Sequence, residues 1–160
     1  MIIKGINIED FINYKLPSMV IVFPSCTFKC EKESKQDFCC QNHDVIKQKS
    51  IDVSYEYIVE LYTANTITKA IVFAGLEPFD SFEDMIKLIE AFRERTSDDI
   101  VIYTGYTESE IAERIHKLQS YKNIIVKFGR FKPSNPLETH YDEVLGVSLV
   151  GDNQYAKKIS

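Results

Sequence analysis

The chain has 160 residues, enough for one domain with a substantial core, and it is 44% hydrophobic and 27% charged. Its net charge of −5 at pH 7 argues against nucleic acid as a partner, because proteins that bind nucleic acids present a basic surface. No apolar stretch approaches the roughly 20 residues of a membrane span, and the first residues lack the pattern of a secretory signal. We therefore expect one domain over residues 1–160, in the cytoplasm and away from membranes.

The first predicted elements lie at the start of the chain. Residues 2–14 are expected to form a short strand or hairpin. Residues 18–24 (SMVIVFP) are an apolar, β-branched run that is typical of a buried strand. The cysteines begin directly after this run, so we expect them on a loop at the carboxyl end of that strand.

All four cysteines lie between Cys26 and Cys40, and the rest of the chain contains none. A framework of structural disulfides would distribute cysteines along the chain in order to close loops, and a domain of this length in a reducing compartment has little need of one. Clustering without a secretory signal favours metal or redox chemistry instead.

The remainder of the chain alternates between helical and strand patterns. Helices are predicted over three segments, residues 54–64, 81–95 and 107–118. Their expected caps are Ser54, Ser81 and Thr107, the last in a capping box with Glu110. Further strands are predicted over residues 69–74, 100–104, 123–128 and, after a loop at 132–139, 144–150.

Strands that alternate with helices indicate an α/β fold with a mostly parallel sheet. In such folds ligands bind beyond the carboxyl ends of the strands. The unusual polar or glycine-containing segments all follow predicted strands, at residues 24–42, 74–78, 104–106 and 129–131. This coincidence predicts a single site at that edge of the sheet.

The cysteine spacing allows more than one metal. Three residues separate Cys26 from Cys30, and nine separate Cys30 from Cys40. Thiolates are the standard ligands of iron–sulfur clusters, and three of them leave the fourth iron of a [4Fe–4S] cluster open to another ligand. Structural zinc on the same three cysteines and His43 fits the spacing equally well, and redox-active or inert cysteines are a third alternative. The spacing does not decide between Cys39 and Cys40.

Two strand ends carry polar groups that can meet a ligand. In AGLEP (residues 74–78) the glycine permits close approach to the backbone, and Glu77 with nearby carbonyls can receive an ammonium group, although such a segment is more often only a turn. In YTGY (residues 103–106) the hydroxyls of Thr104 and of the tyrosines can face a sugar or purine, or the rings can simply cover the core.

The fourth strand ends in two basic residues. Lys127 and Arg130, on either side of Gly129, can meet a carboxylate or the acidic groups of a partner protein. Solvated charge at the end of a strand is the simpler interpretation of both.

Taken together, these segments resemble the radical S-adenosylmethionine activating subunit of anaerobic (class III) ribonucleotide reductase. The matching segments run in the family's order over residues 20–154 and are FPSCTFKC, CCQN, FAGLEPF, IYTGY, VKFGRF and LGVSLVGDNQ. The resemblance implies a small, incomplete (βα) barrel of the radical S-adenosylmethionine type, open on one side toward a partner. It also implies two cofactors, a [4Fe–4S] cluster and S-adenosylmethionine.

The implied activity is that of an activating enzyme. Cleavage of S-adenosylmethionine at the reduced cluster would produce a 5′-deoxyadenosyl radical that takes a hydrogen from a backbone glycine of the large reductase subunit. The electron would come from a flavodoxin-like donor. An activase of another glycyl-radical enzyme, for example one that resembles a formate lyase, and a zinc-stapled binding module without chemistry are the alternatives.

The resemblance also assigns residues. The cluster ligands are Cys26, Cys30 and Cys40, with Cys40 preferred because the following Gln41-Asn42 resembles the end of the family's cysteine loop. The residues expected at the nucleotide cofactor are Asn42, Ala74, Gly75, Glu77, Pro78, Tyr103, Thr104, Gly105 and Lys127. The chain departs from the family pattern in its nine-residue spacing before Cys40, in Ala74 where the family's Gly-Gly-Glu-Pro motif has its first glycine, and in the added Leu76.

Overall fold

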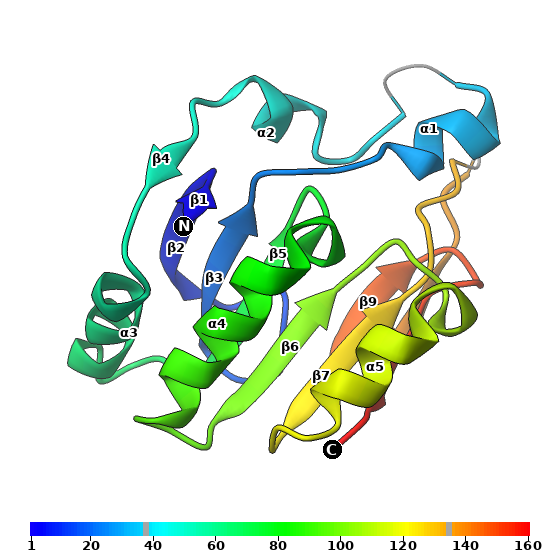
Figure 1. Ribbon diagram of the computed structural model, residues 1–160. Coiled ribbons are helices and arrows are strands. Elements are labelled where there is room, and N and C mark those ends of the chain that lie inside the picture. Colours follow the sequence, from blue (N-terminus) through cyan, green and yellow to red (C-terminus); the bar gives the residue numbers. More distant parts are fainter. Residues whose placement is uncertain (37–38, 134–135) are drawn as a thin grey trace.

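The computed structural model describes residues 1–36, 39–133 and 136–160, and its centre is a six-stranded sheet of order β10-β7-β6-β5-β3-β2 (Figure 1). Four central strands run parallel to one another. They are β3 (Ser18–Phe23), β5 (Ala70–Gly75), β6 (Asp99–Tyr103) and β7 (Ile124–Phe128). The edge strands β2 (Gly5–Asp10) and β10 (Tyr155–Lys158) pair antiparallel to their neighbours.

The central strands agree with the prediction to within about two residues, and the α/β class with a mostly parallel sheet is as expected. Within the described residues β2 and β10 do not pair with each other, so the sheet is open. The incomplete barrel stays a prediction. The final strand β10 was not expected, because its sequence, YAKK, is short and mostly exposed.

The region before β10 differs from the prediction. The strand expected over residues 144–150 is present only as β9 (Val147–Val150), which pairs with β8 (Thr139–Asp142) in a hairpin separate from the main sheet. The expected loop at 132–139 therefore ends where β8 begins, and residues 134–135 lie outside the described part of the chain.

Three helices cover one face of the sheet, as Figure 1 shows. They are α3 (Tyr55–Ala64), α4 (Phe82–Arg93) and α5 (Ala112–Leu118). Ser54 caps α3 as predicted, since its hydroxyl accepts the N–H of Tyr57 at 3.1 Å. Ser81 is the N-cap residue of α4 as predicted, but its side chain makes no capping hydrogen bond. The short 3-10 helix η1 (Pro78–Ser81) precedes α4, and its own cap is Glu77. A second 3-10 helix, η2 (Glu108–Ile111), precedes α5.

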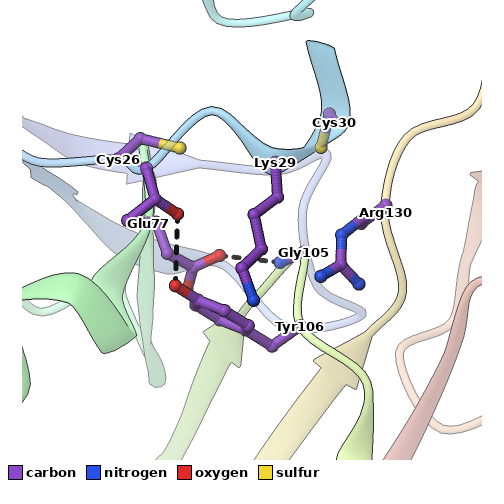
Figure 2. Close-up of a pocket in the computed structure, with 8 residues that line it drawn as sticks. Cys26, Lys29, Cys30, Glu77, Gly105, Tyr106 and Arg130 are labelled. Carbon is purple, nitrogen blue, oxygen red and sulfur yellow. Dashed lines mark hydrogen bonds between the residues drawn. The ribbon is translucent and has the colours of Figure 1, made fainter. Parts of the chain in front are cut away.

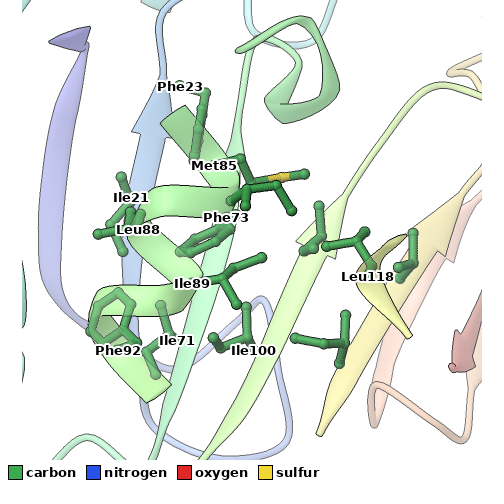
Figure 3. Packing of buried hydrophobic residues seen from close by; sticks show 14 of the residues in the cluster. Ile21, Phe23, Ile71, Phe73, Met85, Leu88, Ile89, Phe92, Ile100 and Leu118 are labelled. Carbon is green, nitrogen blue, oxygen red and sulfur yellow. The ribbon is translucent and has the colours of Figure 1, made fainter. Parts of the chain in front are cut away.

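The larger core lies between the helices and the sheet (Figure 3). Phe73 on β5 packs against Phe92 on α4, with ring centroids 6.4 Å apart, and the ring of Tyr62 meets Phe92 edge-on at 5.5 Å. Each such side chain stabilises the fold by about 1.5–3 kcal/mol through burial.

The opposite face of the sheet has its own apolar layer. Val20, Val72 and Val101 on the central strands pack there with Tyr14, which precedes β3, and with Leu149 of the β8–β9 hairpin. Burial on both faces explains why the central strands read as continuous apolar runs rather than as alternating ones.

The remaining elements extend from the edges of this framework. The short strands β1 (Ile2–Ile3) and β4 (Ile51–Asp52) form a separate pair, so the N-terminal strands pair with β4 and β3 rather than with each other. Helices α1 (Lys29–Ser34) and α2 (His43–Lys47) belong to the cysteine segment. In the described ranges no helix has both the length and the apolar character that crossing a membrane requires.

Candidate iron–sulfur site

The carboxyl ends of the parallel strands and the cysteine segment enclose a cavity of about 140 Å³. The residues that line it include most of those predicted for the site, namely Cys26, Cys30, Cys40, Asn42, Gly75, Glu77, Tyr103, Thr104, Gly105 and Lys127. Ala74 and Pro78 are not among them, since Ala74 packs with the second apolar layer and Pro78 is buried in η1. One cavity thus brings together predicted residues from segments far apart in the sequence.

A smaller hollow adjoins this cavity (Figure 2). It is lined by Cys26, Thr27, Lys29, Cys30, Glu77, Gly105, Tyr106 and Arg130. Gly105 lies beside two of these residues, because a Cβ atom at this position would be in van der Waals contact with the sulfur of Cys30 at 3.7 Å and with Oε2 of Glu77 at 3.6 Å. The thiol of Cys30 therefore lies directly against the carboxyl end of β6.

The cysteine segment is fixed soon after it leaves β3. The N–H of Thr27 donates to Asp80 at 2.7 Å, and the N–H of Phe28 donates to the sulfur of Cys26 at 3.2 Å. Phe28 adopts a left-handed backbone conformation, with φ of 54°, and α1 begins at the next residue. This turn brings Cys30, in the first turn of α1, over the same cavity as Cys26.

Cys39 and Cys40 lie in different surroundings. Cys40 lines the cavity with Cys26 and Cys30, whereas the sulfur of Cys39 lies 3.3 Å from the hydroxyl of Ser34 and Cys39 is not part of the cavity wall. The geometry therefore supports Cys40 over Cys39 as the third ligand, although the residues just before them, 37–38, lie outside the described part of the chain.

The three cavity thiols hold their protons strongly. Burial raises the pKa of Cys26 to about 12, against the opposing N–H of Phe28, and the charges of Glu77 and Asp80 raise it further. Burial likewise raises the pKa values of Cys30 and Cys40. Binding of iron must displace these protons, because a thiolate and not a thiol is the ligand.

Glu77 joins the ends of β5 and β6. Its carboxylate is buried and accepts the hydroxyl of Thr104 at 2.8 Å, the N–H of Gly105 at 2.8 Å and the N–H of Phe79 at 3.1 Å. Burial raises the pKa of Glu77 to about 7, although all three donors act in the opposite direction. Much of the hydrogen-bonding capacity of Glu77 is thus used within the protein. The expectation that Glu77 and nearby carbonyls receive a ligand ammonium group stays a prediction.

The hydroxyls of the YTGY segment are also engaged. Tyr103 donates to the carbonyl of Asn13 at 2.6 Å, and Tyr106 donates to Asp80 at 2.6 Å. Thr104 donates to Glu77 and accepts the N–H of Tyr106 at 3.0 Å. These hydroxyls therefore hold the strand ends in place, and their contact with a sugar or purine stays a prediction.

Asn42 ties the far end of the cysteine segment to the sheet. Its side-chain amide donates to the carbonyl oxygen of Gly75 at 2.7 Å. Gly75 has φ of +102°, and a Cβ atom here would lie 2.6 Å from Cγ1 of Val22 and 2.8 Å from the nitrogen of Phe23. Glycine is thus required at residue 75 by the closeness of β3 rather than by a ligand.

Lys127 and Arg130 are buried, so the interpretation as solvated charge was wrong for both. The ammonium group of Lys127 faces the cavity and donates to the carbonyl of Gly129 at 3.1 Å. Burial lowers the pKa of Lys127 to about 8, while the negative charge of Glu77 raises it in part. Lys127 remains available to an anionic ligand group.

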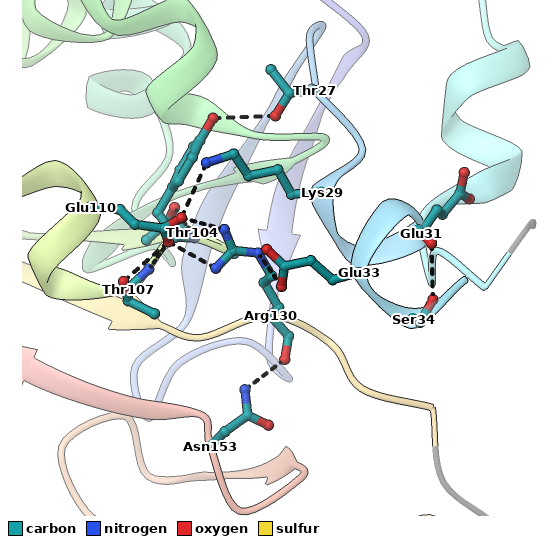
Figure 4. A network of polar contacts seen from close by, with 12 residues as sticks. Thr27, Lys29, Glu31, Glu33, Ser34, Thr104, Thr107, Glu110, Arg130 and Asn153 are labelled. Carbon is teal, nitrogen blue, oxygen red and sulfur yellow. Dashed lines mark hydrogen bonds and ion pairs between the residues drawn. The ribbon is translucent and has the colours of Figure 1, made fainter. Parts of the chain in front are cut away.

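Arg130 forms ion pairs within the chain, as Figure 4 shows. Its guanidinium binds both carboxylate oxygens of Glu110, and its Nε lies 3.1 Å from Glu33 on α1. Lys29 adds an ion pair with Glu110 at 3.1 Å. Arg130 and Lys29 hold the pKa of Glu110 well below its usual range. The acidic groups that Arg130 was expected to meet on a partner are thus Glu33 and Glu110 of this protein. Their ion pairs hold α1 against the sheet.

Comparison with known proteins identifies the family. A family model described as a 4Fe-4S single cluster domain matches residues 18–143. The chain belongs to this family. The matched residues of this 4Fe-4S single cluster domain run from β3 through β8 and contain all four cysteines. Neither the search of curated proteins nor that of solved structures gave a match.

The donor set fits a cluster better than a single ion. Among the described residues no three His, Cys, Asp or Glu side chains are close enough to hold one metal ion, which counts against zinc on Cys26, Cys30, Cys40 and His43. Tetrahedral zinc at about 2.3 Å from each sulfur requires the sulfurs to converge on one point. A cluster spreads its ligands over separate irons, and three thiols around one cavity suit it.

Several residues of the site were not found from the sequence. Phe28, Glu31, Gln41, Phe131 and Gln154 also line the cavity. Gln154 ends the segment LGVSLVGDNQ, which resembles a segment of the activating subunits. That resemblance was the one feature of the sequence that could have placed Gln154 at the site. Glu31 lies in the long spacing before Cys40, for which the usual motif offers no guide.

Proposed function

We propose that this protein is a radical S-adenosylmethionine activase that generates the glycyl radical of an anaerobic ribonucleoside-triphosphate reductase. The observation that carries the proposal is the common cavity, which is lined by three cysteines together with residues of the AGLEP and YTGY segments. The membership in a family of single-cluster domains supports the cluster, and the order of the motifs supports the activase.

Cys26, Cys30 and Cys40 would hold the cluster and leave one iron without a protein thiolate. When bound and reduced, the cluster supplies the electron that breaks a sulfonium–carbon bond of S-adenosylmethionine. The remaining work of the protein is to position the nucleotide and to exclude water from it.

The cavity residues suit the two charged ends of a methionyl group. Lys127 is a buried cation that faces the cavity and suits the carboxylate. The backbone around Gly75 and Leu76 suits the ammonium group, with Glu77 close by as a negative charge. Glu77 acts chiefly through Thr104 and Gly105, because its bonds to them fix the relative positions of the ends of β5 and β6.

The partners follow from the same proposal. We propose that the open sheet is the incomplete barrel of such activases and that the glycine loop of the large reductase subunit approaches the cavity. A flavodoxin-like protein would deliver the electron. No acid–base side chain is needed for this reaction, because the cofactor carries the chemistry.

The experiment is anaerobic reconstitution followed by incubation with S-adenosylmethionine and dithionite. We expect about four irons per chain and the formation of 5′-deoxyadenosine and methionine. Addition of the reductase subunit should then give the EPR doublet of a glycyl radical. The Cys26→Ala variant is the control and should form neither product.

Each outcome has a clear meaning. A four-iron protein that forms no 5′-deoxyadenosine under these conditions would contradict the proposal. Product formation with radical transfer only to a formate-lyase-like enzyme would keep the chemistry and change the partner.

A further inference from the structure

One carboxylate oxygen in the cysteine cavity makes no hydrogen bond within the described part of the chain. Glu31 follows Cys30 in α1 and lines the cavity with Cys26, Cys30 and Cys40. Its Oε1 atom is inaccessible to solvent and makes no hydrogen bond within the described residues. A buried carboxylate oxygen without a donor or a cation carries a cost in free energy, which is larger for a charged group than for a neutral one.

The surroundings of Glu31 increase this cost. Figure 4 shows the side chain of Glu31 directed away from the ion-pair network around Arg130. That network therefore does not neutralise the Glu31 carboxylate. Glu31 lines the same cavity as Cys26, Cys30 and Cys40, so its carboxylate lies next to the proposed cluster ligands.

The other carboxylates near the site differ from Glu31. Glu77 has three donors, and Glu110 has Arg130 and Lys29. Glu33, two residues further along α1, is largely exposed and pairs with Arg130. Of these four carboxylates, Glu31 alone has a buried oxygen that makes no hydrogen bond.

We propose that Glu31 is the fourth, exchangeable ligand of the cluster, and that its carboxylate occupies the iron without a thiolate until S-adenosylmethionine displaces it. An oxygen–iron bond forms when the nucleotide is absent. It breaks when the amino and carboxylate groups of the nucleotide bind, and Glu31 leaves as the carboxylate, so that no electron or proton is transferred. This inference rests on the three-thiolate cluster of the proposed function.

Such a ligand has a definite use. A cluster held by three thiolates loses its fourth iron on oxidation, because that iron has no protein ligand. A carboxylate of the chain would retain the iron in the resting protein. It would still exchange readily, because an oxygen ligand binds iron less tightly than a thiolate does.

The test is controlled oxidation of the anaerobically reconstituted full chain without S-adenosylmethionine. One equivalent of ferricyanide takes one electron, and the [4Fe–4S]²⁺ cluster becomes [3Fe–4S]⁺ with release of Fe²⁺. The EPR signal of the three-iron cluster then measures the loss. We expect Glu31→Gln to lose iron at least about tenfold faster than the wild type, since even outer-shell partners of metal ligands contribute 10–100-fold to affinity.

Glu113→Gln is the control. It removes the same charge from an exposed residue on α5 that does not line the cavity and takes no part in holding the cysteine segment. It should lose iron at the wild-type rate. Equal rates for the wild type and Glu31→Gln would overturn the proposal. The same holds if Glu31→Gln weakens only the binding of S-adenosylmethionine, since Glu31 would then contact the nucleotide and not the iron.

A measurement on the wild type covers the case in which the variant does not assemble a cluster. Protein grown with ¹³C-labelled glutamate should show a ¹³C ENDOR coupling to the reduced cluster, and S-adenosylmethionine should abolish it. Absence of the coupling would rule out the ligand. Neither readout uses turnover, so failure of the proposed activase reaction is distinguishable from failure of this inference.

Discussion

The side-chain amide of Asn42 donates to the carbonyl oxygen of Gly75 over 2.7 Å and so joins the far end of the cysteine segment to the carboxyl end of β5. The near end of the segment is held by the N–H of Thr27, which donates to Asp80 at 2.7 Å. Cys30, Cys39 and Cys40 lie between these two bonds, and Cys26 directly precedes the first of them.

Replacement of Asn42 by alanine should loosen Cys40 more than the rest of the fold. Loss of the bond to Gly75 should lower the free energy of unfolding by about 1 kcal/mol, measured by urea denaturation of the apoprotein. The reconstituted variant should release iron to a chelator several-fold faster than the wild type. Asn7, which is exposed on β2, offers the control Asn7→Ala, which should change neither quantity. Unchanged iron release in Asn42→Ala would show that Asn42 does not position the cysteine loop.

Substitutions of Thr104 test whether Glu77 holds the ends of β5 and β6 together. Thr104→Val keeps the shape but removes the hydroxyl that donates to the buried carboxylate at 2.8 Å. A hydrogen bond to a charged group is worth about 1.5–3 kcal/mol, so we expect a loss of that size in chemical denaturation. Thr104→Ser keeps the hydroxyl and should recover most of the loss. If Thr104→Val is no less stable than Thr104→Ser, the bond from the hydroxyl to Glu77 does not stabilise the fold.

Glu110 should make stability depend on pH in the acid range. Its pKa is held below the ordinary 4.5 of a glutamate, first by the bonds from Arg130. The carboxylate of Glu110 therefore binds a proton less readily in the folded state than in the unfolded chain. Its contribution to the free energy of unfolding is complete above pH 4.5 and is lost as the pH falls below that value. Its side chain is 31% exposed, so solvent screens part of the effect.

The measurement compares wild type and Glu110→Gln by urea denaturation across the acid range. The wild type should be more stable by about 1–2 kcal/mol at pH 7, and the difference should shrink steadily below about pH 4.5. Other carboxylates titrate in both proteins, so the difference isolates Glu110. A gap that stays constant with pH would mean that the ion pair with Arg130 adds nothing to the folded state.

Single substitutions can decide which cysteine supplies the third thiolate ligand of the cluster. Cys40 lines the cavity, while Cys39 lies beside Ser34. We expect Cys39→Ala to retain about four irons per chain after reconstitution, and Cys40→Ala to retain far fewer, as Cys26→Ala and Cys30→Ala should. Iron analysis and the visible absorption of the cluster give the answer. The assignment fails if only the Cys39 variant loses its cluster.

The sheet was predictable because its signals are local and strong. Apolar runs such as residues 18–24 are buried on both faces, and the helices between them carry clear periodicity. Carboxyl ends of parallel strands meet at one edge, so the site could be located from the order of the segments alone. The strand β10 carries no such signal, because its exposed residues follow no apolar pattern and its pairing with β7 is non-local.

The chemistry of individual side chains was less predictable. A hydroxyl such as that of Tyr103 can face a ligand or a backbone carbonyl, and only the folded position of Asn13 decides between them. The same applies to Arg130, whose partners Glu33 and Glu110 lie on separate elements. Sequence patterns identify which residues gather at the site, whereas their hydrogen bonds depend on contacts between distant parts of the chain.

The anchors of the cysteine segment have a consequence for how the metal arrives. Asn42, Thr27 and Arg130 hold the segment through bonds that involve no metal. In a zinc finger, by contrast, the free energy of metal binding is what folds the chain. The cluster site of this protein should therefore be formed before the metal arrives. A carrier could then transfer a finished cluster to it, and the chain would not have to refold around the cluster.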